Sequence, residues 1–447
     1  MAPMDLRDVD SLVEATPDSR NRVVDFLRAL AILVVAFGHW TAAAVVVRDG
    51  TLVSNQILNI ASWTHPLTWV IQVMPVFFLV GGYANALSWR SAQRRGEGYA
   101  AWLRSRLRRL GTPVIPLLLV WLAIASIAYA AGVPGGTLRT ASQVALVPTW
   151  FLAAYVMVVA LAPPALKLWE RLGWWAVAGL LALGGLVDLA SIRSGSDLAG
   201  FPNYVIVFGA VHMIGFAWLD GRLPGIRNRL SLAAIGAVGT VLLVWLGPYP
   251  VSMVGLDNAT LNNSFPTRVT MGFLGLLQGG LLLALEPTFQ RWLQRPKPWR
   301  FTILVNARIM TLYLWHLTAM VAVIGISLAL KGFGLHSEPL SGAWWATRPV
   351  WWAVLAVVTV GFIAIFGRFE NPAKDLRPSP PTWLSIVACV AMCAGLAVMA
   401  MFGIVDKGGV NWWWPLVPIA GLTLTGMIPW GRTRTASSSS PDAGRDG

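Results

Sequence analysis

The sequence holds few charged side chains: Asp, Glu, Lys and Arg make up 12% of its 447 residues, against about 25% in ordinary globular proteins. So few charges cannot cover soluble domains of this total size, which excludes an ordinary water-soluble protein. Hydrophobic residues make up 56% of the chain and come in runs of about 18–25 residues, the length that crosses a bilayer as a helix. The composition therefore indicates an integral membrane protein embedded in a lipid bilayer.

Cysteine is equally scarce. The two cysteines, Cys389 and Cys393, stand four residues apart in one apolar run, a spacing that suits neither a disulfide framework nor a zinc site. We expect two small buried side chains there. The chain also lacks a P-loop, a Gly-x-Ser-x-Gly elbow and a His-Glu-x-x-His motif. We therefore expect no metal and no bound cofactor.

Twelve apolar runs predict an all-α fold, each run crossing the bilayer once. Trp residues often stand at the ends of the runs, where amphipathic rings favour the membrane interface. A membrane β-barrel would show alternating segments of roughly 10 residues instead. The runs cover residues 23–47, 67–90, 113–131, 144–162, 173–190, 203–219, 230–247, 268–285, 303–329, 350–367, 384–403 and 411–430.

The net charge of +14 follows from the placement of Lys and Arg in alternate connections between the runs. Because these residues do not form one soluble basic face, nucleic acid is not the expected partner. The positive-inside rule makes the basic connections cytoplasmic, so we expect a multi-pass protein of the cell (plasma) membrane with both termini in the cytoplasm. Residues 1–22 then form a polar cytoplasmic tail, and the Ser-rich residues 431–447 a disordered tail.

Three polar side chains mark the first run, namely Asp25, Arg28 and His39. A charged residue at mid-bilayer costs at least ~2.5 kcal/mol, which makes it a candidate functional residue. Arg28 and His39 are eleven residues apart, close to three helical turns, so they share a face at a distance of about 16 Å. An Asp25–Arg28 pair at the headgroups together with a hydrogen-bonded core histidine would explain the same pattern.

Three of the five histidines, His39, His212 and His316, fall near the middle of their runs. A neutral imidazole can accept a proton near pH 7, so a histidine at this depth suits a general base. Each could instead bridge two helices, and this alternative is favoured for His212.

The connection between the second and third runs is the most basic part of the chain and includes Arg106 and Arg109. It could simply anchor the protein on the cytoplasmic side. It could also bind a phosphorylated ligand, because the guanidinium group offers paired donors to phosphate oxygens. Gly81 and Gly82, within the second run, allow another backbone or a ligand to approach closely, although helix packing through small residues is the commoner explanation.

Several segments, in order along the chain, resemble the acyltransferase-3 family of integral membrane acyltransferases, and the likeness is to its actinobacterial members. Residues 22–39, with ten residues between Arg28 and His39, resemble the opening helix of that family. Residues 75–83 resemble its Phe-Phe-x-x-Ser-Gly-Tyr/Phe segment, and residues 106–113 its Arg-x-x-Arg motif with a following proline. Residues 150–152, 203–215 and 313–316 match later landmarks.

The resemblance covers about residues 22–367 and implies a ten-helix acyltransferase core at 23–367, followed by two additional helices within 368–430. It implies transfer of an acyl group, such as acetyl, from cytoplasmic acyl-CoA to a hydroxyl of an extracytoplasmic or membrane-associated acceptor, often a sugar. The chain departs from the family at Gly81, where the family has serine, so a serine nucleophile is excluded at this position.

Together, the spacing and the resemblance predict His39 as the catalytic base and Arg28 as its partner near the donor thioester. Arg106 and Arg109 are predicted to bind the nucleotide end of acyl-CoA. The resemblance adds a set of supporting residues, namely Asp25, Gly81, Gly82, Tyr83, Trp150, Asn203 and His316.

A transporter or lipid-linked sugar flippase is the rival interpretation, because many spans with a buried His and Arg would suit it. Transporters commonly consist of two related halves. Here the marked residues fall in a few spans without a matching second set, which favours the enzyme.

Overall fold

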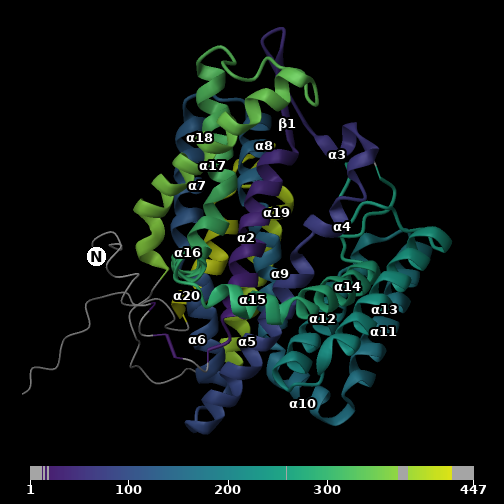
Figure 1. The fold of residues 1–447 in the computed structure, drawn as a ribbon. Helices are drawn as coiled ribbons and strands as arrows, with labels where there is room; N and C mark the ends of the chain where they lie inside the picture. The colour runs from purple at the N-terminus through teal and green to yellow at the C-terminus, as the bar shows by residue number, and fades with distance from the viewer. Residues whose placement is uncertain (1–12, 14–15, 18–19, 258, 371–380, 425–447) are drawn as a thin grey trace, which may run out of the picture.

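The computed structural model describes residues 13, 16–17, 20–257, 259–370 and 381–424. In this part of the chain almost all regular structure is helical, with two short antiparallel hairpins (Figure 1). Eight of the described helices are long and apolar enough to cross a membrane, or up to eleven when each bent helix pair counts as one span. The predicted all-α membrane fold is confirmed. The predicted tail at 431–447, and most of the one at 1–22, lie outside the described residues.

The eight long spans match eight of the predicted runs, with shifted boundaries. They are α2 (Arg22–Ala42), α4 with α5 (Thr68–Ile71 and Met74–Arg94), α11 (Trp174–Ser194), α12 (Asn203–Leu219, preceded by η2, Asp197–Gly200), α13 (Gly225–Leu246), α17 (Ile309–Ala329), α18 (Gly342–Phe366, followed by η3, Gly367–Phe369) and α19 (Thr382–Phe402).

Three further runs belong to helix pairs that bend at a proline. The pairs are α6 (Tyr99–Gly111) with α7 (Val114–Ala130) at 40°, α8 (Gly135–Leu146) with α9 (Pro148–Ala160) at 41°, and α14 (Val269–Ala284) with α15 (Glu286–Leu293) at 51°. Pro113, Pro148 and Pro287 stand at the three bends. Proline lacks the N–H group and its ring clashes with the preceding turn, so it separates the two halves.

The first run was predicted to extend to residue 47, and this boundary is wrong. Helix α2 ends at Ala42, and residues 43–47 enter strand β1 (Ala43–Arg48), which pairs with β2 (Thr51–Gln56). The two turn residues, Asp49 and Gly50, have φ of 50° and 74°, the left-handed conformations of a two-residue hairpin. Val45, Val46 and Val47 continue the apolar run, but the turn at Asp49 and Gly50 places them in a strand rather than in the helix.

The remaining elements are short. They are α3 (Ile57–Ile60), η1 (Ser62–Thr64), α10 (Ala162–Leu172), α16 (Pro296–Ala307), the hairpin of β3 (Val405–Asp406) and β4 (Gly409–Val410), and α20 (Trp413–Leu424). Helix α20 lies within the predicted run 411–430, whose last residues are outside the described part of the chain.

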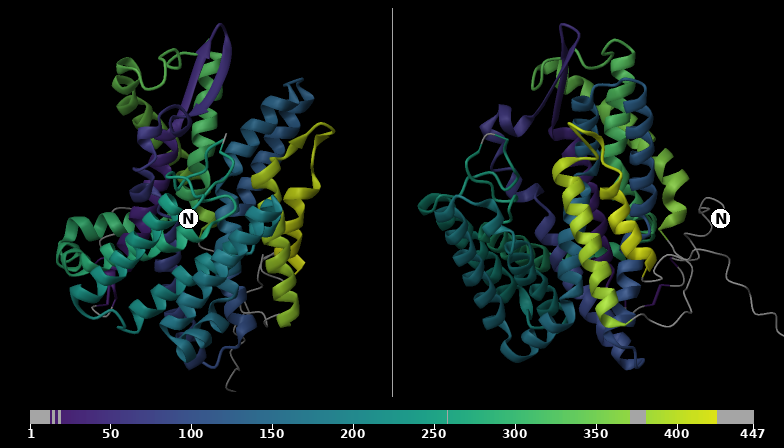
Figure 2. Two further views of the ribbon diagram at one scale, coloured as in Figure 1. Left: turned by 90° about the vertical axis from the view of Figure 1, so that its right-hand side faces the viewer. Right: turned by 180° about the vertical axis from the view of Figure 1, so that it is seen from behind.

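Helices α10 to α14 form a group beside the rest of the bundle (Figures 1 and 2). Helix α5 joins the two groups, since it packs against α12 and α14 and also against α2. At Gly82 the contact leaves no room for a side chain, because an added Cβ would lie 1.9 Å from the backbone oxygen of His212 on α12. A Cβ added at Gly215 on α12 would likewise clash with the backbone oxygen of Leu79. Gly82 therefore serves helix packing.

The two additional C-terminal helices pack directly on the bundle (Figure 2). Helix α19 contacts α9, α8 and α6, and α20 contacts α19 and α7. The hydroxyl of Thr149 on α9 donates to the backbone oxygen of Leu396 on α19 at 2.9 Å. Cys389 and Cys393 on α19 are buried and unbridged, and the Cys393 thiol lies 3.5 Å from the oxygen of Ala153, as expected for small core side chains.

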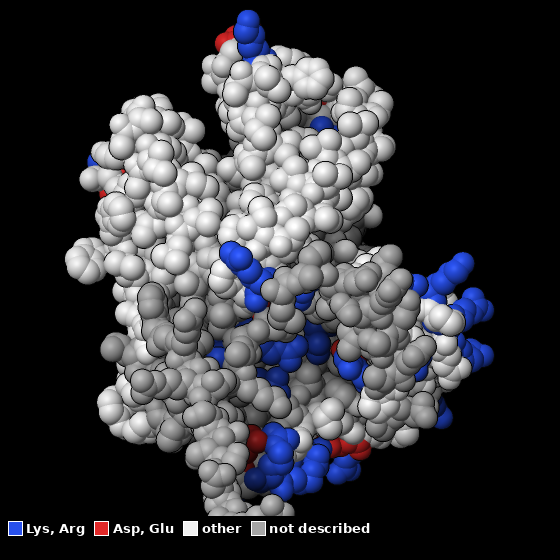
Figure 3. All heavy atoms as spheres, turned by 90° about the vertical axis from the view of Figure 1, so that its left-hand side faces the viewer, with Lys and Arg blue, Asp and Glu red and all other residues white. Residues whose placement is uncertain are grey.

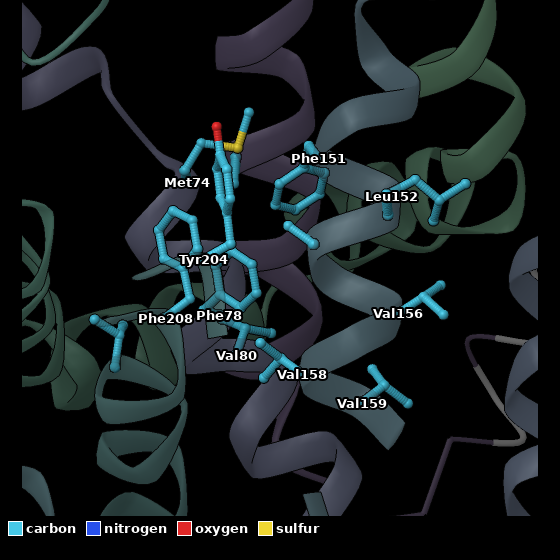
Figure 4. Close-up of a cluster of buried hydrophobic side chains, with 14 of the residues drawn as sticks. Met74, Phe78, Val80, Phe151, Leu152, Val156, Val158, Val159, Tyr204 and Phe208 are labelled. Atoms are coloured by element: carbon cyan, nitrogen blue, oxygen red, sulfur yellow. The ribbon is translucent and has the colours of Figure 1, made fainter. Parts of the chain in front are cut away.

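An aromatic core lies between α5, α9 and α12. Phe78 and Phe208 stack with ring centroids 4.0 Å apart, and Phe151 meets Phe78 edge-on at 5.5 Å. Figure 4 shows these rings on one side of α9, while Leu152 and Val156 point to the other side. Helix α9 is thus buried on two faces, which fixes the position of the aromatic residues beside the candidate site.

Candidate functional site

Two histidines from distant parts of the sequence meet inside the bundle. The Nδ1 atom of His39 on α2 lies 2.9 Å from the Nε2 atom of His316 on α17. Their rings are nearly parallel, with an interplanar angle of 8° and centroids 5.2 Å apart. His316 is fully buried, whereas His39 is half-buried. The structure therefore brings the predicted base into direct contact with a residue predicted only to support it.

The hydrogen bonds of the pair fix where its protons lie. His316 Nδ1 is 2.6 Å from the backbone oxygen of Tyr313, and a carbonyl oxygen can only accept, so this nitrogen carries the proton. In the neutral ring His316 Nε2 is then an acceptor, and His39 Nδ1 must donate to it. A neutral His39 is left with its lone pair on Nε2, the form that a general base requires.

Neighbouring side chains hold the pair in place. Trp40, the residue after His39, donates its indole N–H to the backbone oxygen of His316 at 3.0 Å. The Tyr313 hydroxyl donates to the oxygen of Pro148, at the bend between α8 and α9, at 2.6 Å. Helices α2, α17 and α9 are thus tied together within one turn of the two imidazoles, which keeps both rings in a defined orientation.

Arg28 lies on the same helix as His39, toward the end of the bundle opposite the β1–β2 hairpin. Its guanidinium group is 3.6 Å from the carboxylate of Asp25, and its side chain is 26% exposed. The Asp25 carboxylate makes a closer contact with Arg20, at 2.7 Å. Asp25 is therefore engaged mainly by Arg20, and Arg28 keeps N–H groups that can bind a ligand.

Arg106 and Arg109 on α6 lie close enough to Arg28 on α2 to interact electrostatically with it. Figure 3 shows a hollow in one face of the molecule in which Lys and Arg side chains gather. The three arginines predicted to bind the donor are therefore neighbours in the fold. The positive charges of the three arginines repel one another. An anionic ligand bound between them would reduce this repulsion and would therefore be stabilised.

Glu370, which the sequence analysis did not single out, lies at the same end of the bundle. Its carboxylate accepts from the backbone N–H groups of Met310 and Thr311, at 2.9 and 3.2 Å, at the start of α17. It is also within electrostatic range of Arg109. Burial is the largest influence on this carboxyl and raises its pKa, against the opposing effect of its hydrogen bonds. Glu370 thus caps the helix that carries His316.

Tyr155 is a second residue missed from the sequence. A Cβ at Gly81 would lie 2.9 Å from the Tyr155 hydroxyl and 2.8 Å from its ring. Tyr155 is also within electrostatic range of both Arg106 and Arg109. The departure from the family pattern at Gly81 therefore makes room for a phenol hydroxyl, and only the contact between α5 and α9 reveals it.

Three other predicted supporting residues, Asn203, Tyr83 and Trp150, have their contacts with residues outside the histidine pair. Asn203 is buried and donates to Asp188 at 2.8 Å, within a polar cluster at the start of α12. The ring of Tyr83 packs on that of Trp218 at an interplanar angle of 53°, with centroids 4.8 Å apart. Trp150 lies in the aromatic core, 5.7 Å from Tyr204.

His212, the third histidine at mid-run, does not join the pair either. Its Nδ1 atom lies 3.0 Å from the backbone oxygen of Phe78, so His212 bridges α12 and α5. This is the alternative that the sequence favoured for it.

The fold and the site define a polytopic α-helical membrane protein with an imidazole pair inside the bundle and an arginine cluster at one end. The chain belongs to the acyltransferase-3 family, because the model of its Acyltransferase domain matches residues 21–368. This match confirms the family resemblance and covers every predicted site residue, while α19 and α20 follow it. The comparisons with curated proteins and with solved structures found no match.

Proposed function

We propose that this membrane acyltransferase moves a short acyl group, such as acetyl, from cytoplasmic acyl-CoA to a hydroxyl of an extracytoplasmic or membrane-associated acceptor, a sugar or glycoconjugate. The observation that carries the proposal is the proton order of the histidine pair, which leaves the lone pair of His39 Nε2 free. An O-acyl transfer needs such a base, because the attacking hydroxyl must lose a proton.

In the proposed reaction both substrates are bound at once. His39 Nε2 takes the proton of the acceptor hydroxyl while its oxygen attacks the thioester carbonyl carbon. The C–O bond forms, the C–S bond breaks, and the imidazolium returns the proton to the leaving thiolate of CoA. His316 acts through His39 as a positioning residue, since it receives the His39 Nδ1–H hydrogen bond.

The arginine cluster would hold the donor. Arg106 and Arg109 would bind the phosphates at the nucleotide end, and Arg28 the part closer to the thioester. The Tyr155 hydroxyl, beside Gly81, would donate to the carbonyl oxygen as negative charge develops there.

The deciding experiment incubates the purified protein with labelled acyl-CoA and a panel of hydroxylated acceptors. We expect release of free CoA that depends on the acceptor, together with a labelled ester product. A transporter or flippase would move the polar substrate across a proteoliposome membrane and leave the thioester intact, which would overturn the proposal.

The arginine cluster gives a kinetic prediction. Arg109→Ala should raise the KM for acyl-CoA with a smaller effect on kcat, since it removes binding shared by the ground state and the transition state. Arg28→Ala, nearer the thioester, should lower kcat as well. Donor KM should also rise with salt, because exposed charges are screened over about 8–10 Å at ordinary ionic strength.

Arg227, an exposed arginine at the start of α13, provides the matched control. Arg227→Ala should leave donor KM and its salt dependence unchanged. If Arg109→Ala has the same donor KM as the parent protein across the salt series, Arg109 does not bind the donor and only anchors this connection on the cytoplasmic side.

The proposed sidedness predicts opposite labelling at the two ends of the bundle. Ser54 on the β2 strand and Ser105 on α6 are both exposed, and the two native cysteines are buried. In intact cells, a membrane-impermeant maleimide should label Ser54→Cys but not Ser105→Cys. Labelling of both residues from the same side would contradict a cytoplasmic donor site.

A further inference from the structure

Helix α18 carries a buried arginine at the end of the bundle that bears the β1–β2 hairpin. Arg348 is only 3% exposed, and its guanidinium group lies 4.2 Å from the ring centroid of Trp344 and 5.3 Å from that of Trp351. The segment before α18 holds the hairpin through an ion pair between Glu338 and Arg48. Arg348 is therefore a positive charge enclosed by indole rings near the predicted outer surface.

No carboxylate in the described part of the chain forms an ion pair with Arg348. Its Nε–H group donates to the backbone oxygen of Trp344 at 3.3 Å. The buried Arg268, by contrast, lies 3.4 Å from Asp188. An enclosed charge without a counterion is costly, and a charged residue within a span marks a functional site by default.

Two further donors on the same face of α18 have no acceptor in the described structure. The indole N–H groups of Trp344 and Trp352 are buried and make no hydrogen bond. Trp344, Arg348 and Trp352 are spaced by four residues and therefore line one stripe of the helix. Apart from the bond between Arg348 Nε and the Trp344 backbone oxygen, these buried donors are left for the oxygens of an anion.

The stripe is connected to the histidine pair. Trp351, which contacts Arg348, donates its indole N–H to the backbone oxygen of Trp40 at 3.2 Å. Trp40 follows His39 and donates to the backbone oxygen of His316. An acceptor whose hydroxyl reaches His39 from the hairpin end would have the rest of the molecule on the side of Arg348.

We infer that Arg348, Trp344 and Trp352 form a subsite for a carboxylate or phosphate group of the acceptor. This inference rests on the proposed function and narrows the acceptor to an anionic one, such as an acidic sugar. The guanidinium fork would pair with two oxygens of the anion, the indole N–H groups would donate to it, and the tryptophan rings would contact the sugar face.

The test uses two acceptors that differ only in the anionic group, a methyl glucuronide and a methyl xyloside, with the protein in nanodiscs of neutral phosphatidylcholine. Arg348→Gln should raise the KM for the glucuronide by about 10- to 100-fold, the loss expected for a charged hydrogen bond of about 1.5–3 kcal/mol. The KM for the xyloside and for acyl-CoA should not change. Trp344→Phe and Trp352→Phe, which keep a ring and remove the N–H, should each show a smaller change in the same direction.

Arg193, exposed near the end of α11, is the matched control, and Arg193→Gln should behave as the parent. A direct binding measurement separates this inference from the proposed function: the glucuronide should raise the Tm of the parent protein, and Arg348→Gln should abolish the shift. If that binding holds while no thioester is turned over, the subsite stands and the proposed function fails.

Three outcomes would overturn the inference. The first is an equal rise in the KM values for the glucuronide and the xyloside in Arg348→Gln. The second is a parent protein that does not bind the glucuronide. The third is a Tm shift that depends on Arg348 only when phosphatidylglycerol is added, which would assign the subsite to a lipid headgroup.

Discussion

Replacement of His39 by alanine is expected to lower acyl transfer by about 100- to 10,000-fold, the usual contribution of a general base. The variant removes the nitrogen whose lone pair the His316 hydrogen bond leaves free. It should still insert into the membrane and bind acyl-CoA, because Arg28, Arg106 and Arg109 are unchanged. The measurement is the rate of ester formation at saturating acyl-CoA, with donor binding followed separately.

His316→Gln is the companion variant. It should lower the rate less and shift the pH dependence of kcat, because the partner that orients His39 is altered while the base itself remains. Full activity of His39→Ala would contradict the mechanism. If His316 proves indispensable and His39 does not, the two roles are reversed.

Removal of the Asp188 carboxylate is expected to destabilise the protein by about 3–5 kcal/mol, the usual cost of breaking a buried ion pair. Asp188 is fully buried on α11 and accepts from the Tyr249 hydroxyl at 3.0 Å and from the Val269 N–H at 2.8 Å. It also lies 3.4 Å from the buried Arg268. Asp188→Ala would leave Arg268 without its buried counterion. The free energy of unfolding of this variant in detergent micelles, compared with that of the parent protein, measures the lost stability.

Asp197 provides a control on the same arginine. Its carboxylate is also 3.4 Å from Arg268, but its side chain is 71% exposed. An exposed ion pair contributes about 0–1 kcal/mol, so Asp197→Ala should change the free energy of unfolding little. If Asp188→Ala and Asp197→Ala lower the free energy of unfolding by similar amounts, the burial of Asp188 does not determine how much it stabilises the protein.

Local features of the sequence predicted much of the fold. The twelve apolar runs located the long spans, and local signals in the sequence account for the end of the first helix and for three bends. The Asp49-Gly50 turn ended the first helix at Ala42, and prolines at 113, 148 and 287 bent three spans. Both kinds of signal are readable in the sequence, because they depend on one or two neighbouring residues.

The arginines of the candidate site were also predictable as a group. Arg28 was marked by its place in an apolar run, and Arg106 and Arg109 by their spacing and by the family resemblance. The structure adds that α6 and α2 bring all three within electrostatic range of one another. The proximity of Tyr155 to Gly81 could not be predicted, since it depends on how α9 crosses α5.

The sequence by itself determined the class of protein, the approximate spans and the family, because hydropathy, charge placement and short motifs act over a few turns of one helix. The tertiary structure alone decided that His39 meets His316, which is 277 residues away along the chain, and that the free lone pair lies on His39 Nε2. It also decided that Arg348 is enclosed without a carboxylate partner in the described residues. These features depend on which helix faces pack together, and packing involves the whole bundle rather than any local pattern.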